Sequence, residues 1–190
     1  GEGGHGVIVL SPNAIKRLST FHPERPLPKI FRLVKNGKLI QGVYEGETLN
    51  TPSMFCVADA LDSLSWIKEI GGLKETIRRS DKNFECLQGW VDETPWIENL
   101  VSDPSNRSNT SVCLKFSDDR LLKLNKEEQT NFVKKFVELL EAENAAFDIK
   151  GHRNAPPGLR IWCGATVNHD DIQNLLPWLD WCFKEIISKY

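Results

Sequence analysis

The sequence contains no long apolar run and no excess of charge of one sign. Apolar runs such as residues 7–10 have the length of a strand, whereas about 20 consecutive apolar residues are needed to cross a bilayer. The 24 Lys and Arg residues nearly balance the 26 Asp and Glu residues, which leaves a net charge of -2. This balance argues against binding of nucleic acid or a membrane surface through bulk charge. The composition therefore predicts a soluble globular protein with neither nucleic acid nor a membrane as its partner.

The five cysteines form no C-x-x-C motif, and no histidine stands at metal-ligand spacing from them. Because structural zinc sites need such spacing, we predict no metal site. Dispersed cysteines, odd in number, are typical of reduced thiols and favour a cytoplasmic location. The sequence also lacks an initiator Met and a secretory signal, and its glycine-rich start leads directly into an apolar run. We therefore expect the chain to be the C-terminal part of a longer protein.

Hydrophobic residues make up 40% of the 190-residue chain and charged residues 26%, as in one globular domain or slightly more. Helical periodicity alternates with short apolar runs that are typical of strands. From residue 94 onward this order predicts a small α/β sandwich, an open sheet covered by helices. Helices are expected at residues 53–70, 73–91, 126–144 and 170–187, the last kinked or split by Pro177, and strands at 111–116, 146–149 and 159–162.

The first 40 residues carry their own local signals. Residues 7–10 are consistent with a buried strand. Ser11 is placed to cap a helix in which Pro12 takes the first position. Further on, Asn36-Gly37 stands between two apolar segments, which is the strongest short signal for a β-hairpin.

The glycine-rich stretch at residues 1–6 superficially suggests a phosphate-binding loop. The dinucleotide fingerprint needs a strand before the glycines and a helix after them, so that the helix N-terminus meets the pyrophosphate. Here a strand is expected after the glycines instead. We therefore interpret the stretch as a loop where the backbone passes close to a ligand or another chain.

A second candidate site is the segment Asn50-Thr51-Pro52-Ser53, which stands directly before an expected helix. Polar side chains at the positive end of a helix dipole suit a phosphate or a carboxylate. The alternative is an ordinary helix N-cap, and the local sequence by itself favours that alternative.

A third candidate site surrounds a glycine-bounded Pro-Pro turn. Arg160 stands between Leu159 and Ile161 on an expected strand, so its side chain should face opposite to theirs. A guanidinium in apolar surroundings needs an anionic partner, and its planar fork matches a carboxylate. His152 and Arg153, before the turn, could bind a phosphate. An internal salt bridge for Arg160, with solvated charges on the turn, is the alternative.

Four segments together resemble one known family. Residues 1–11, 46–54, 107–114 and 155–167 are similar, in order and in register, to motifs of the phosphoserine aminotransferase family. This family consists of class V enzymes of the fold-type I superfamily, which use pyridoxal 5'-phosphate. The resemblance covers essentially the whole chain and rests on four motifs.

The resemblance implies a fold and a division into domains. It implies the tail of the large cofactor-binding domain with connecting helices at residues 1–93, and a small C-terminal α/β domain at residues 94–190. The family's Schiff-base lysine would lie upstream of Gly1, so no lysine of this chain is assigned a catalytic role. The chain by itself is therefore expected to be inactive.

The resemblance also implies roles for individual residues. Asn50 and Thr51 would bind the cofactor phosphate in the active site of the neighbouring subunit of a homodimer. Arg160 would bind the substrate α-carboxylate, and His152 and Arg153 the substrate phosphate. The turn after Arg153 is one residue longer than in a bacterial branch of the family, which makes that match weaker.

The implied reaction transfers the amino group of L-glutamate to 3-phosphohydroxypyruvate and gives O-phospho-L-serine and 2-oxoglutarate, a step of serine biosynthesis. Phosphohydroxythreonine is a further substrate class of this family. Two alternatives stay open. One is a class V aminotransferase of the alanine–glyoxylate or serine–glyoxylate type, acting on an unphosphorylated substrate. The other is a non-catalytic folding or dimerisation fragment.

Overall fold

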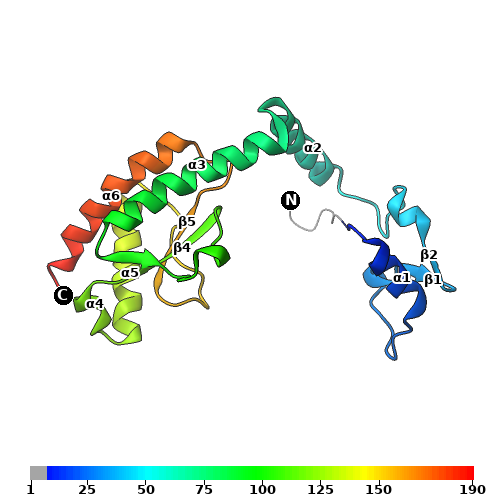
Figure 1. The fold of residues 1–190 in the computed structure, drawn as a ribbon, viewed down its shortest axis with the longest axis horizontal. Helices are drawn as coiled ribbons and strands as arrows, with labels where there is room; N and C mark the ends of the chain where they lie inside the picture. The colour runs from blue at the N-terminus through cyan, green and yellow to red at the C-terminus, as the bar shows by residue number, and fades with distance from the viewer. Residues whose placement is uncertain (1–7) are drawn as a thin grey trace. The chain divides into compact units, whose positions relative to one another are not determined.

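The computed structural model describes residues 8–190 and divides into two units (Figure 1). The N-terminal unit ends at Trp66 and the C-terminal unit begins at Ile67. The glycine-rich stretch and Val7 lie outside the described residues. A domain boundary at residues 93 and 94 stays a prediction. No helix within residues 8–190 combines the length and apolar character that a membrane span requires.

The N-terminal unit consists of short elements connected by long turns. Ser11 caps the first helix as expected, because its hydroxyl accepts a hydrogen bond from the Ala14 amide at 3.2 Å. Residues 8–10, expected as a strand, form no strand. Not one of residues 8–66 is buried, so this described part has no hydrophobic core of its own. Its elements are α1 (Pro12–Thr20), η1 (Lys29–Phe31), β1 (Val34–Lys35), β2 (Lys38–Leu39), η2 (Gln41–Tyr44) and most of α2 (Met54–Glu69).

The hairpin predicted from Asn36-Gly37 is confirmed. β1 and β2 pair antiparallel, with Val34 opposite Leu39 and Lys35 opposite Lys38. Asn36 and Gly37 have φ values of 52° and 72°. Two successive residues with positive φ make the turn whose twist matches that of paired strands, and Asn-Gly adopts it readily.

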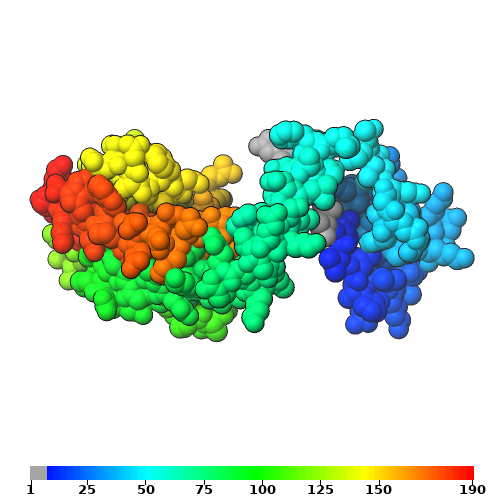
Figure 2. All heavy atoms as spheres, turned by 90° about the horizontal axis from the view of Figure 1, so that it is seen from above, coloured from blue at the N-terminus to red at the C-terminus, as the bar shows by residue number. Residues whose placement is uncertain are grey.

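The C-terminal unit is a three-stranded antiparallel sheet with helices against one face. The strand order is β3-β4-β5, with β4 in the centre. In the space-filling view, α6 runs along the surface of this unit between α3 and α5 (Figure 2). Its elements are α3 (Gly72–Glu93), β3 (Ile97–Asn99), η3 (Pro104–Asn106), β4 (Ser111–Phe116), α4 (Asp119–Leu122), α5 (Lys126–Ala142), β5 (Gly158–Trp162) and α6 (His169–Ile187).

The core of this unit lies between the sheet and its helices. Side chains alternate along β4, so that Val112, Leu114 and Phe116 are buried while the residues between them are half-buried. Trp96 anchors an aromatic cluster and stacks on Phe183 with ring centroids 4.1 Å apart. The opposite sheet face has no covering helix from this unit. The α/β sandwich expected from the sequence is therefore confirmed.

The C-terminal unit differs from the sequence predictions at three points. Residues 146–149 form no strand; instead Ile149 accepts one hydrogen bond from the Arg160 amide, and Lys150 forms an isolated bridge with Leu159. β3 was not expected, since a three-residue edge strand has no periodicity to read. α6 continues through Pro177 as one helix, so Pro177 does not split it, and a kink at this residue stays a prediction.

Candidate functional site

Arg160 lies in the middle of β5, opposite Cys113 of β4. Its neighbours Leu159 and Ile161 are buried on the helix-covered face. The Arg160 side chain therefore extends from the uncovered face, where it is 38% exposed. The orientation expected from the sequence is confirmed.

The internal salt bridge considered as an alternative is present as a long contact. A terminal nitrogen of Arg160 lies 3.5 Å from a carboxylate oxygen of Asp148. The Asp148 side chain is 91% exposed, and its φ is 53°, in the left-handed region. Because exposed ion pairs contribute only about 0–1 kcal/mol, this contact leaves Arg160 able to exchange Asp148 for another carboxylate.

Arg160 and Asp148 line one groove of about 530 Å³ at the edge of the sheet. Its apolar walls come from the segment after α5, from β5 and from the first turns of α6. The cationic group therefore lies at the border of an apolar groove, as in pockets that orient small polar ligands. The lining residues are Ser111, Ala145, Ala146, Phe147, Asp148, Ile149, Arg160, Ile161, Trp162, Val167, Asp171, Ile172 and Leu175.

Trp162 is a groove residue that the sequence analysis missed. Its indole Nε1 donates a hydrogen bond to Thr166 Oγ1 at 3.1 Å. A Cβ at Gly164 would collide with the same ring. The absence of a side chain at this position therefore leaves the space that the indole occupies. The available signal was spacing, because Trp162 stands two residues after Arg160 and so shares its face of the strand.

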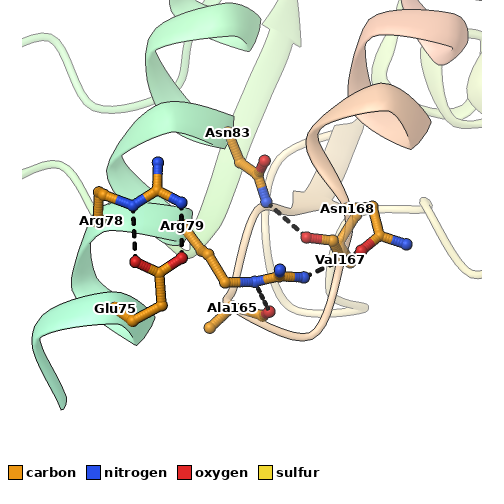
Figure 3. A network of polar contacts seen from close by, with 7 residues as sticks. All are labelled: Glu75, Arg78, Arg79, Asn83, Ala165, Val167 and Asn168. Atoms are coloured by element: carbon orange, nitrogen blue, oxygen red, sulfur yellow. Dashed lines mark hydrogen bonds and ion pairs between the residues drawn. The ribbon is translucent and has the colours of Figure 1, made fainter. Parts of the chain in front are cut away.

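The loop between β5 and α6, which carries one wall of the groove, is fixed by α3 (Figure 3). The buried Asn83 amide donates to the Val167 carbonyl at 3.0 Å and to the Cys163 carbonyl at 3.3 Å. Arg79 donates to the Ala165 carbonyl at 2.8 Å and to Asn168 Oδ1 at 3.0 Å. Buried amide bonds of this kind hold a loop in one conformation.

One turn of α3 away, a second polar pair lies on the surface of the same helix (Figure 3). Arg78 donates two hydrogen bonds to the Glu75 carboxylate, at 2.6 and 2.7 Å. These bonds lower the pKa of Glu75. The pair stabilises the helix locally and lies outside the groove lining.

His152 and Arg153 lie on the exposed turn that leads into β5. His152 Nδ1 accepts a hydrogen bond from the Asn154 amide at 3.2 Å. Within residues 8–190 the Arg153 side chain forms no hydrogen bond or ion pair. Neither residue lines the groove that contains Arg160, so their role in phosphate binding stays a prediction.

The backbone on either side of this turn is closely packed. The Gly151 amide donates to the Gly158 carbonyl at 2.9 Å. A Cβ at Gly158 would collide with the Leu114 carbonyl oxygen of β4. The glycine therefore allows β5 to approach β4 directly before Arg160, which sets the position of that residue.

Asn50 and Thr51 lie in the N-terminal unit and are exposed. α2 begins at Met54, and the cap position belongs to Ser53, whose hydroxyl accepts a hydrogen bond from the Cys56 amide at 3.4 Å. Asn50 and Thr51 form no hydrogen bond within the described part of the chain. Ser53 thus fulfils the ordinary capping role, and the function of Asn50 and Thr51 stays a prediction.

Two of the cysteines have unreactive thiols. Burial raises the pKa of Cys163 and of Cys182 to about 12, since a thiolate is poorly solvated among apolar side chains. Among residues 8–190 no three His, Cys, Asp or Glu side chains are grouped so as to hold a metal ion.

Comparison with known proteins reveals clear sequence relatives. No family model matches the chain. The phosphoserine aminotransferases of Methanosarcina barkeri and Methanosarcina mazei are 44% and 43% identical to it over 185 residues. These residues are 96% of this chain and 47% of each relative. The chain therefore spans about half the length of the curated relatives that it matches.

Solved structures show the same fold. Phosphoserine aminotransferase from Bacillus circulans subsp. alkalophilus matches with a TM-score of 0.60 and 23% identity, over 72% of this chain and 34% of that chain. The enzyme of Trichomonas vaginalis, solved with pyridoxal phosphate bound, matches with a TM-score of 0.60 and 21% identity, over 73% of this chain and 36% of that one. At these identities the match establishes the fold and nothing about ligands.

Proposed function

The chain is a homologue of phosphoserine aminotransferases and spans about half their length, and we propose from this that it supplies the substrate-binding part of such a transaminase. The reaction transfers the amino group of L-glutamate to 3-phosphohydroxypyruvate. The products are O-phospho-L-serine and 2-oxoglutarate, within serine biosynthesis. The 44% identity to the Methanosarcina barkeri enzyme carries this proposal.

Arg160 binds the α-carboxylate that the amino donor and the oxo acid have in common. Support comes from its place at the border of an apolar groove and from its weak, exposed contact with Asp148. An incoming carboxylate replaces Asp148 and accepts two parallel hydrogen bonds from the guanidinium.

His152 and Arg153 bind the substrate phosphate. Both are exposed, and the Arg153 guanidinium has no carboxylate partner within residues 8–190. A phosphate dianion at one end of the substrate and a carboxylate at the other fix the reacting carbon between them. Such orientation supplies a large part of the rate of enzymes.

Asn50 and Thr51 hold the phosphate of pyridoxal 5'-phosphate. Their side chains precede α2 and have hydrogen-bonding groups without partners in the described chain. They lie near the positive end of that helix, which fits a phosphate group. When bound, pyridoxal phosphate serves as the electron sink of the reaction. In a homodimer these two residues serve the active site of the neighbouring subunit.

We place the protein in the cytoplasm. Cys86, Cys113, Cys163 and Cys182 carry free thiols, which is the usual state in a reducing compartment.

A chimera tests this function. The chain replaces the matching 185 residues of the Methanosarcina barkeri enzyme, and transamination of 3-phosphohydroxypyruvate by glutamate is measured. We expect an active enzyme. The double substitution His152→Ala and Arg153→Ala should lower kcat/KM for the phosphorylated acid at least tenfold and leave that for glyoxylate unchanged.

Lys134→Ala is the control, because Lys134 makes only an exposed ion pair with Glu138 at 3.6 Å. A chimera that binds pyridoxal phosphate but transfers no amino group would refute the proposed activity. Equal losses for the phosphorylated acid and glyoxylate would refute the assignment of His152 and Arg153.

A further inference from the structure

A second cavity, of about 400 Å³, lies within the N-terminal unit. It is formed by the end of α1, the proline-rich connection to η1, and the β1–β2 hairpin. Its lining includes four basic side chains, Arg17, His22, Arg25 and Arg32, and two aromatic ones, Phe21 and Phe31. None of them has a role in the function proposed above.

The ionisable side chains that line this cavity are all basic. No Asp or Glu among residues 8–190 lines it. Within residues 8–190, Arg17, Arg25 and Arg32 form no salt bridge. Cations that share a small volume repel one another. An anion that entered the cavity would relieve this repulsion.

Two of the guanidinium groups are already held in place. Arg32 Nε donates a hydrogen bond to the Leu27 carbonyl at 2.7 Å. An arginine has five N–H donors, and the terminal nitrogens of Arg32 form no further bond within the described chain. Arg17 lies over the Phe21 ring at 4.1 Å, in a cation–π contact. Donors held in this way lose little entropy when a ligand binds.

The connection that carries His22 and Arg25 is stiffened by proline. Pro23, Pro26 and Pro28 stand within six residues of one another, and each fixes its φ angle. His22 and Arg25 themselves form no hydrogen bond or ion pair in the part of the chain described here. They are the basic groups that a ligand would engage directly.

We propose that this cavity binds a small organic phosphate monoester. Three guanidinium groups around one space suit a phosphate dianion, because the fork of arginine binds phosphate oxygens in pairs. The exposed rings of Phe21 and Phe31 accept an apolar group attached to that phosphate. The volume lies at the lower end of the range for small-molecule pockets, about 300–1,000 Å³.

The test is titration of the full 190-residue chain with phenyl phosphate, inorganic phosphate and benzyl alcohol, followed by amide NMR. We expect phenyl phosphate to bind more tightly than inorganic phosphate, and benzyl alcohol not to bind. The largest shifts should occur at His22, Arg25 and Gly37, which line the cavity. Arg25→Ala with Arg32→Ala should weaken phenyl phosphate binding at least tenfold.

Matched variants locate the bound ligand. Lys38→Ala, in β2 but outside the cavity lining, should leave the affinity unchanged. Arg25→Lys keeps the charge and loses the fork, so it should give an intermediate affinity even if the double variant is unfolded.

Three results would overturn the proposal. The first is absence of binding to the unaltered chain. The second is a set of amide shifts that is confined to residues 151–160 and is abolished by the double substitution His152→Ala and Arg153→Ala. This result would instead support the proposed substrate site. The third is displacement of phenyl phosphate by an equimolar acidic hexapeptide, which would assign the cavity to a protein partner.

Discussion

Arg160 combines two properties on one strand. It is flanked by buried Leu159 and Ile161, and its own side chain leaves the opposite face of the strand and lines an apolar groove at the edge of the sheet. Alternation along the sequence was enough to predict which face it takes. Its contact with Asp148 could not be predicted, because that contact depends on a left-handed residue in an irregular segment.

Asp148 competes with carboxylate ligands for Arg160. Asp148→Asn removes the negative charge, so 2-oxoglutarate should bind the chain about two- to fivefold more tightly, as an exposed ion pair of about 1 kcal/mol or less allows. Isothermal titration calorimetry measures this change. Asp171→Asn is the control, because Asp171 lines the groove and has no ion pair within residues 8–190. Equal affinities for Asp148→Asn and the unaltered chain would exclude this competition.

The buried thiols make the free energy of unfolding depend on pH in the alkaline range. Folding raises the pKa of Cys163 from 9.0 to about 12, so the folded state keeps a proton that the unfolded state loses above pH 9. The contribution of this thiol to the free energy of unfolding is therefore fully present below pH 9. It should be lost as the pH rises towards 12. Urea midpoints at pH 8 and pH 10.5 measure the loss.

Cys163→Ala is the comparison that isolates this thiol from other groups. The variant should lose less stability between the two pH values than the unaltered chain does. An equal loss in both proteins would contradict the shifted pKa. Rapid alkylation of Cys163 by iodoacetamide at pH 8 in the folded protein would contradict its burial.

At the level of elements, local chemistry predicted the helices and the hairpin well. The cap at Ser11 and the turn at Asn36-Gly37 were correctly assigned, because their determinants lie within four residues of one another. β3 was missed because its three residues become a strand only by pairing with β4. Residues 146–149 are apolar enough for a strand, but Asp148 turns the chain with a φ of 53°.

Gly158 tests how β5 is positioned. Gly158→Ala should destabilise the C-terminal unit by about 1–3 kcal/mol, because the added Cβ meets the Leu114 carbonyl oxygen. Gly89→Ala, in the interior of α3 with open space around it, should instead stabilise by about 0.5–1 kcal/mol. Urea denaturation of both variants measures the two effects. Similar stabilities for the two variants would show that β5 can shift without cost.

The two units of the molecule differ in how many of their residues are buried. The C-terminal unit has a continuous core from α3 to α6, whereas no residue among 8–66 is buried. Composition alone could not reveal this difference, because apolar residues occur in both units. Burial depends on which apolar groups have a surface to pack against.

Hydrogen exchange should reflect this difference in the 190-residue chain. Amides of α1 should exchange much faster than those of β4 and α6, because opening them exposes no core. If the basic cavity binds phenyl phosphate, saturation with it should slow exchange in the segments that line the cavity, from the end of α1 to Gly37, and leave exchange in β4 and α6 unchanged. Equal protection of α1 and α6 in the ligand-free chain would contradict the packing described here.

The role of Arg160 is tested most directly by steady-state kinetics of the chimera with glutamate as the amino donor. Arg160→Ala should lower kcat/KM about 30-fold or more, because loss of one partner of a charged, hydrogen-bonded pair costs about 2–5 kcal/mol. Arg160→Lys should recover only part of it, since an ammonium lacks the planar fork. A kcat/KM for Arg160→Ala within threefold of the unaltered chimera would show that this guanidinium does not bind the substrate carboxylate.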